Sequence, residues 1–123
     1  MKILIAIGTG SFIGAVSRYL LSQIIHTKLS MAFPWGTLIV NIVGCFLIGI
    51  IFGLSDRANL PQEWRLFLAT GLIGGFTTYS AFSFETMSML REGQLWYASA
   101  YVLASIVVGL IATFIGITII ECV

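Results

Sequence analysis

Charged residues are scarce in this sequence: Asp, Glu, Lys and Arg make up 9% of its 123 residues, and the formal net charge is +1. No run of basic residues appears that would hold a nucleic acid, so we expect no nucleic-acid partner. The chain also contains no repeat and no low-complexity tract. Its function therefore has to be sought in uncharged groups.

Histidine and cysteine are also rare, with one histidine and two cysteines. No nucleophile and base stand in a catalytic arrangement, and His26 has no metal-ligand partner spaced nearby, so we expect no enzyme. His26 is predicted to be solvated in a connection between helices. The cysteines are too few for a disulfide framework; Cys122 lies at the tail, and Cys45, inside an apolar stretch, is interpreted as a small packing residue.

Apolar residues, by contrast, make up 59% of the chain, more than a soluble domain of this length needs. This composition is typical of an integral membrane protein. We predict an all-α protein with a single transmembrane domain that covers residues 1–123. The lipid bilayer surrounds its helices. Segments long enough to cross a bilayer of ~30 Å as helices are Ile3–Ile25, Gly36–Leu54, Leu66–Leu90 and Trp96–Ile120.

The third segment has paired glycines, Gly74 and Gly75, followed by the hydroxyl residues Thr77, Thr78 and Ser80. Backbone that unwinds inside a membrane survives only where protein buries it or where it lines a watery path, and broken helices of this kind hold ions and substrates in transporters. We therefore predict a break near residues 74–80, about halfway along the span, with the function located there. The alternative is a packed kink whose carbonyls are satisfied by the neighbouring hydroxyl groups.

The orientation of the chain is poorly specified. Lys2, Arg57 and Arg65 lie on one side of the predicted spans, and Lys28 and Arg91 lie on the other. So small a difference is a weak signal under the positive-inside rule, and a chain without a preference can insert both ways and pair antiparallel with itself. The twofold axis of such a pair lies in the membrane plane, where unwound carbonyls of both breaks can coordinate a cation such as Na⁺. A weak preference for a cytoplasmic N-terminus is the alternative.

Several polar side chains lie inside the predicted spans. Asn41 must either form hydrogen bonds across helices or face a polar path. Arg18 and Glu85 lie closer to span ends, where they can extend to the interface, set the charge at the mouth of a pathway, or pair with each other. Two glycine motifs, Gly10-x-x-x-Gly14 and Gly49-x-x-x-Gly53, predict close helix packing.

The fourth segment carries Tyr101, Ser105 and Thr113, with Gly109 at the intervening position. Residues four apart share one face of a helix, so these hydroxyl groups form a stripe. The stripe predicts a ladder of hydrogen-bond donors along a pore wall. The alternative is that each Ser or Thr hydroxyl bonds to a preceding carbonyl of its own helix.

At these residues the chain resembles the Fluc/CrcB family of fluoride channels, in three motifs that occur in the family's order. The chain departs from the family pattern at Tyr79, where phenylalanine is usual, at Ala81, where threonine is usual, and at Gly109, where serine is frequent. The motifs are Gly10-x-x-x-Gly14-Ala15-x-x-Arg18-Tyr19, Gly36-Thr37-Leu38-x-Val40-Asn41-x-x-Gly44 and Gly71-x-x-Gly74-Gly75-x-Thr77-Thr78-Tyr79-Ser80-x-Phe82-Ser83.

The resemblance implies an antiparallel, dual-topology homodimer in the cell inner membrane, with two fluoride pores, passive fluoride efflux and one Na⁺ at the dimer axis. By position, it implies that the backbone carbonyls of Gly74 and Thr77 hold the Na⁺. It also implies that Arg18 lies in the vestibule and that Glu85 is the family's third-helix glutamate. The residues it implies for the fluoride pathway are Asn41, Tyr79, Phe82, Tyr101, Ser105 and Thr113.

Two other functions compete with this one. A small four-helix, dual-topology drug exporter needs a membrane-embedded acid to exchange protons, but the first span has no Asp or Glu, and Glu85 lies toward the end of its span. A membrane assembly subunit without transport activity is the third possibility. The hydroxyl stripe and the predicted break argue against it.

Overall fold

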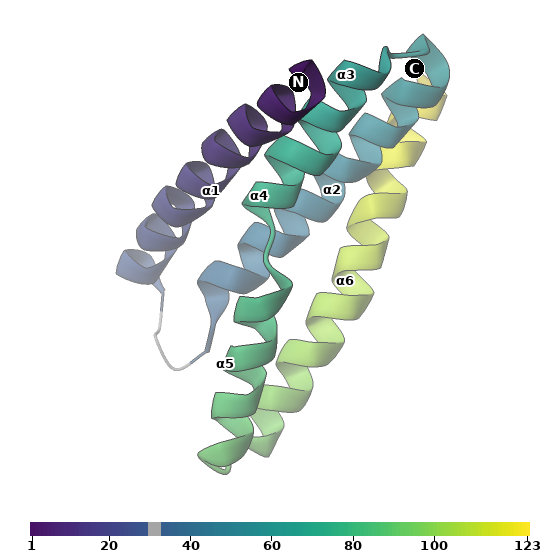
Figure 1. Ribbon diagram of the computed structural model, residues 1–123. Helices are drawn as coiled ribbons and strands as arrows, with labels where there is room; N and C mark the ends of the chain where they lie inside the picture. Colours follow the sequence, from purple (N-terminus) through teal and green to yellow (C-terminus); the bar gives the residue numbers. More distant parts are fainter. Residues whose placement is uncertain (30–32) are drawn as a thin grey trace.

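The computed structural model describes residues 1–29 and 33–123, and within these ranges every regular element is helical (Figure 1). Four stretches are long and apolar enough to cross a membrane, which confirms the predicted spans. They are α1, α2, a composite third segment from α3 to α5, and α6. The elements are α1 (Lys2–Lys28), α2 (Trp35–Ala58), α3 (Gln62–Arg65), the π-helical η1 (Leu66–Ile73), α4 (Gly74–Phe76), α5 (Tyr79–Arg91) and α6 (Leu95–Cys122).

The four stretches run alternately up and down, so the two termini lie at the same end of the bundle (Figure 1). The helix α1 packs along η1 and α4, and α2 packs along α6. Because α2 and α6 are separated by the third segment, they run in the same direction. In this parallel pair, residues near the start of α2 lie beside residues near the start of α6. This arrangement brings polar residues of the two helices together in the site.

Small residues allow both pairs of helices to approach closely. A Cβ atom on Gly10 would lie 2.6 Å from the carbonyl oxygen of Phe67 in η1, and Gly14 meets the same segment one turn later. Gly49 and Gly53 likewise let α2 touch α6. Both predicted packing motifs are therefore used inside the chain, and the surface for any partner has to lie elsewhere.

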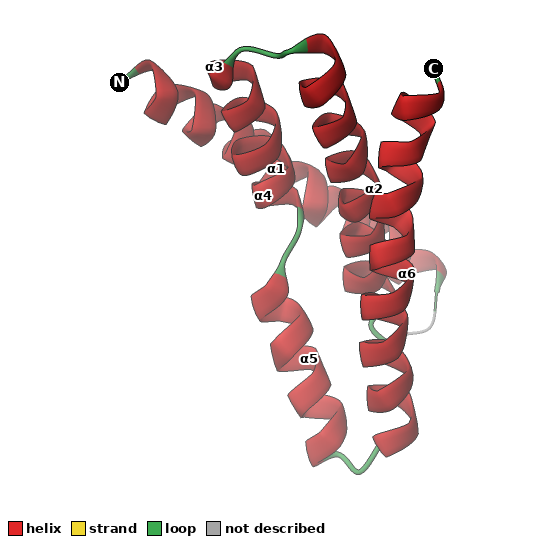
Figure 2. Ribbon diagram, turned by 90° about the vertical axis from the view of Figure 1, so that its right-hand side faces the viewer, coloured by secondary structure: helices red, strands yellow, loops and turns green. Residues whose placement is uncertain are grey.

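The third segment is interrupted at Thr77 and Thr78, whose backbones are extended, with φ/ψ of −90°/159° and −147°/120°. Figure 2 shows this interruption as the open stretch of chain between α4 and α5. It lies inside the predicted range of 74–80, but the paired glycines themselves are helical. Gly75 serves close packing instead, since a Cβ there would lie 2.6 Å from the carbonyl oxygen of Ser11.

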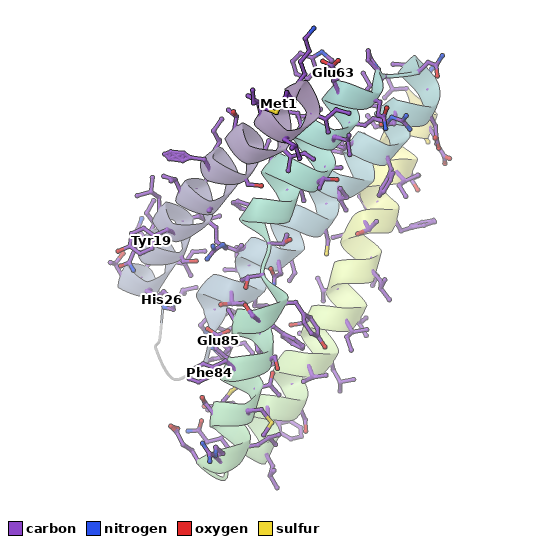
Figure 3. The ribbon with its side chains drawn as sticks, viewed as in Figure 1. Met1, Tyr19, His26, Glu63, Phe84 and Glu85 are labelled. Atoms are coloured by element: carbon purple, nitrogen blue, oxygen red, sulfur yellow. The ribbon has the colours of Figure 1, made fainter. Side chains whose placement is uncertain are left out.

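The expectation for His26 was wrong, because α1 continues to Lys28 and includes this residue. The side chain is partly buried and packs on the start of α2, where a Cβ on Gly36 would lie 2.8 Å from the imidazole Nε2. His26 therefore has a packing role at the junction of α1 and α2. Figure 3 labels it near the lower end of α1.

Candidate functional site

A groove of about 450 Å³ opens beside the break. Its walls come from α2, from both sides of the break in the third segment, and from α6. The fold therefore brings together residues that are far apart in the sequence. Of the predicted site residues, the groove is lined by Asn41, Gly74, Thr77, Tyr79, Phe82 and Ser105.

Asn41 binds the unwound backbone directly. Its Nδ2 donates to the carbonyl oxygen of Thr78 at 3.0 Å, and its Oδ1 accepts from the Thr78 amide at 2.9 Å. The carboxamide thus replaces the hydrogen bonds that the backbone loses on leaving the helix. Asn41 thus forms hydrogen bonds across helices, as one of its two interpretations predicted, and it also lines the groove.

The carbonyls of Gly74 and Thr77 are among those that lose their helical donors at the break. In a continuous α-helix the amides of Thr78 and Ala81 would donate to the carbonyls of Gly74 and Thr77. Here the Thr78 amide donates to Asn41, and the Ala81 amide donates to the Thr78 hydroxyl at 3.2 Å, which caps α5. The carbonyls of Gly74 and Thr77 are thereby left available to another ligand.

Two neighbouring carbonyls, those of Ile73 and Gly75, have side-chain donors inside the chain. The Thr77 hydroxyl donates to the carbonyl oxygen of Ile73 at 3.1 Å, as the packed-kink alternative proposed. Arg18 Nε donates to the carbonyl oxygen of Gly75 at 3.2 Å. The guanidinium group of Arg18 therefore lies against the turn that precedes the break.

Ser105 is different from its neighbours, because its hydroxyl oxygen is buried and has no hydrogen-bond partner among the described residues. Such a group costs free energy unless something else binds it. Ser105 lines the groove, so a ligand that reaches its hydroxyl can accept a hydrogen bond from it.

Aromatic rings continue from the break toward the interior. The rings of Tyr79 and Phe82 are 5.9 Å apart, and those of Phe82 and Tyr101 are 5.1 Å apart. Tyr79 is 80% exposed, whereas Tyr101 is completely buried. The row therefore leads from an open surface into the core between α5 and α6.

Beyond the groove, Glu85 collects two hydroxyl donors. Its Oε1 accepts from the Tyr101 hydroxyl at 2.9 Å, and its Oε2 accepts from Thr37 Oγ1 at 3.0 Å. Figure 3 labels Glu85 on α5. Glu85 and Arg18 thus have different partners and do not form the pair considered as one alternative from the sequence.

Thr37 is a residue of this cluster to which the sequence analysis gave no role. The signal that could have found it is its spacing: Thr37 lies four residues before Asn41, and therefore on the same face of α2. Thr37 and Asn41 form a stripe of polar side chains on the second span, as the hydroxyl groups do on the fourth.

The hydroxyl groups of α6 do not share one environment. Tyr101 binds Glu85, Ser105 has no partner among the described residues, and Thr113 Oγ1 donates to the backbone carbonyl of Cys45 at 3.0 Å. Tyr101 and Thr113 thus reach other helices, unlike Thr118, which bonds to a carbonyl of its own helix. Thr113 lies outside the groove lining.

This site can hold a small anion. The Asn41 amide, the Ser105 hydroxyl and the Tyr79 hydroxyl are neutral donors, and the edge of the Phe82 ring carries partial positive charge. No cationic side chain is among the residues that line the groove, and Arg18 is bound to the carbonyl of Gly75. The lining can therefore solvate an anion without fixing it by a full charge.

The chain is similar to known proteins over most of its length. A family model described as "CrcB-like protein, Camphor Resistance (CrcB)" matches residues 5–117. A protein of Chlorobium phaeobacteroides named fluoride-specific ion channel FluC is 46% identical over 114 residues, which cover 92% of this chain and 88% of the relative.

Proteins of the same name from two other bacteria are equally similar. That of Geobacter sulfurreducens is 46% identical over 118 residues, 95% of each chain, and that of Agrobacterium fabrum is 47% identical over 112 residues, 90% of each chain. With the model match and these identities over nearly the full length, the chain belongs to the Fluc/CrcB family.

Proposed function

We propose that the protein is a fluoride-selective channel through which cytoplasmic fluoride leaves the cell passively. The observation that carries this proposal is the groove at the break, which is lined by Asn41, Phe82 and Ser105; the Ser105 hydroxyl has no partner among the described residues. The names of the similar bacterial proteins support the same ion. The negative-inside membrane potential drives the anion outward, and no catalytic step is involved.

The chemistry of the groove suits fluoride. A conducting path must replace the hydration shell of the ion at several sites, none so tight that the ion cannot leave. A carboxamide has two N–H groups, and Asn41 uses only one on Thr78, so the second is left for an anion. Ser105 and Tyr79 add hydroxyl donors, and Phe82 adds a ring edge. Chloride, which is larger and accepts weaker hydrogen bonds, is disfavoured.

The path continues through Tyr101 and Thr113 on α6. In the structure both hydroxyl groups donate to protein oxygens, of Glu85 and of Cys45. An anion that reaches these hydroxyl groups must compete with the protein oxygen that already accepts each hydrogen bond. Anion binding there is therefore weaker than at Ser105. Arg18 concentrates anions near the entrance through its charge.

The channel is an antiparallel homodimer with two pores. The single chain exposes 7781 Å², whereas a compact monomer of its mass, 13.4 kDa, exposes about 6,500 Å². Tyr79, beside the groove, and Phe84, further along α5, are among the exposed aromatic residues, so a second copy laid across α5 covers them. The near balance of Lys and Arg lets the two copies insert in opposite orientations in the cell inner membrane.

A Na⁺ ion fits the break at the dimer axis. The carbonyls of Gly74 and Thr77 have lost their helical donors, and carbonyl oxygens are ligands that a hard cation accepts. Apart from its own stretch of helix, a Cβ on Gly74 would meet a single atom of the described residues within 4 Å, the Ala69 carbonyl oxygen at 3.6 Å, so a second chain has room to approach. The ion supplies positive charge between the two pores and joins the two breaks.

Purified protein in liposomes loaded with fluoride tests the function. A fluoride electrode should record release when a K⁺ gradient and valinomycin set the potential, and a chloride electrode should record none. Liposomes without protein are the control for leakage of HF. Release of both halides contradicts selectivity, and proton-coupled export of a cationic drug without fluoride release establishes the exporter instead.

The orientation is tested separately at Cys122, which is exposed at the end of α6. In sealed vesicles, an antiparallel dimer exposes one of its two tails on each side. A membrane-impermeant thiol reagent should therefore label half of the Cys122 side chains, and the rest only after detergent is added. Labelling of all or none before detergent contradicts dual topology.

A further inference from the structure

A second groove lies away from the break, between the start of α1 and the start of the third segment. It has a volume of about 280 Å³, and its lining residues are Ala6, Glu63, Trp64 and Phe67. None of them lines the groove at the break. The helix α1 contacts α3 and η1, and Figure 3 labels Met1 and Glu63 at this end of the bundle. The proposed channel gives this second groove no role.

The second groove lies at the level where a membrane meets water. Glu63 and Trp64 stand near the start of the third membrane-spanning stretch, Gln62–Arg91, shortly before the apolar η1. Trp64 is 57% exposed, and tryptophan prefers the headgroup region of a bilayer. On the opposite wall, Ala6 belongs to the first turns of α1. A lipid beside these helices therefore presents its headgroup, rather than its tails, to the groove.

The lining of the second groove combines two aromatic rings with one carboxylate. The rings of Trp64 and Phe67 are 5.9 Å apart and nearly perpendicular, at 85°. Glu63 is the only charged residue of the lining, and no Lys or Arg lines the groove beside it. Aromatic faces attract cations, and a carboxylate accepts hydrogen bonds from an ammonium group. The groove is therefore complementary to a small organic cation.

A positive charge lies one helical turn away on α1. Lys2 is exposed and precedes Ala6 by four residues, so the two share one face of α1. A ligand with its ammonium group at Glu63 can therefore place a phosphate near Lys2. One negative and one positive side chain at this end of the bundle are complementary to a zwitterionic headgroup, whose amine and phosphate carry opposite charges.

We propose that the second groove binds the headgroup of a phosphatidylethanolamine, with the ammonium group between Glu63 and the Trp64 ring and the phosphate at Lys2. This inference does not depend on the ion that the protein conducts. A primary ammonium group has three N–H donors, from which Glu63 can accept. The quaternary ammonium of a phosphatidylcholine has no N–H to donate, and a phosphatidylglycerol has no cation. The groove therefore selects the ethanolamine lipid.

Native mass spectrometry of the purified protein tests this binding with phosphatidylethanolamine, phosphatidylcholine and phosphatidylglycerol of identical tails. The ethanolamine lipid should bind most tightly. Glu63→Gln, which keeps an acceptor but removes the charge, and Trp64→Leu should each weaken its binding about tenfold. Ala6→Phe fills the groove and should abolish the binding. The matched control is Glu92→Gln, which changes an exposed glutamate after α5 and should bind the lipid like the wild type.

Thermal unfolding of each variant without added lipid separates lipid binding from folding, because Glu63 also suits the first turn of α3. If a groove variant does not fold, Lys2→Gln, at an exposed position, should still weaken the binding about threefold. Wild-type binding of the ethanolamine lipid in Glu63→Gln or in Lys2→Gln overturns the inference. Equal binding of the three lipids to the wild type also overturns it. So does a change from dimer to monomer in Ala6→Phe, because a second copy then fills the groove.

Discussion

The two hydrogen bonds between Asn41 and Thr78 make a sharp prediction for Asn41→Leu. Leucine has the branched shape of asparagine but leaves both the amide and the carbonyl of Thr78 without their partner. Each unsatisfied, partly buried group costs about 1–3 kcal/mol, of which water in the groove recovers a part. We therefore expect a loss of about 2–4 kcal/mol from the conformation of the break.

If conduction needs this conformation, a loss of about 2–4 kcal/mol slows fluoride efflux by about 30-fold or more. The assay is the initial rate of fluoride release from liposomes, with thermal unfolding in detergent measured on the same preparation. Asn41→Asp keeps the acceptor for the Thr78 amide but places an oxygen against the Thr78 carbonyl, and it adds a negative charge that repels the anion. Both variants should be slow. An Asn41→Leu protein with wild-type efflux and wild-type thermal stability would refute the reasoning.

Three further predictions address other parts of the site. Phe82→Ile removes a ring edge from the groove and should lower fluoride efflux about tenfold, while size-exclusion chromatography still shows a dimer; unchanged efflux removes the ring from the path. Gly75→Ala should destabilise the protein by about 1–3 kcal/mol in thermal unfolding, because its Cβ meets the backbone of α1, whereas the matched Gly8→Ala, whose Cβ has no described residue packed within 4 Å, should have little effect. Replacing Na⁺ by N-methylglucamine should abolish efflux if the carbonyls of Gly74 and Thr77 hold the ion, and full efflux without Na⁺ would contradict that site.

Part of the site follows from the sequence because it depends on local properties. The hydroxyl run after Gly75 placed the break within a few residues, and the spacing of Tyr101, Ser105 and Thr113 put them on one face of α6. The mechanism of the break did not follow. Gly75 stays helical and packs on Ser11, while Thr78 can leave the helix because Asn41 replaces its helical partners.

The membrane class, the four spans and the polar stripes were determined by the sequence alone, since they depend on how apolar residues and spacings repeat along one helix. Only the tertiary structure decided which donors are free. Ser105 and Thr113 look alike on α6, yet Thr113 is bound to Cys45 and Ser105 has no partner among the described residues. That difference depends on how α6 lies against α2, because a helix fixes which side chains share a face but not which groups of another helix they meet.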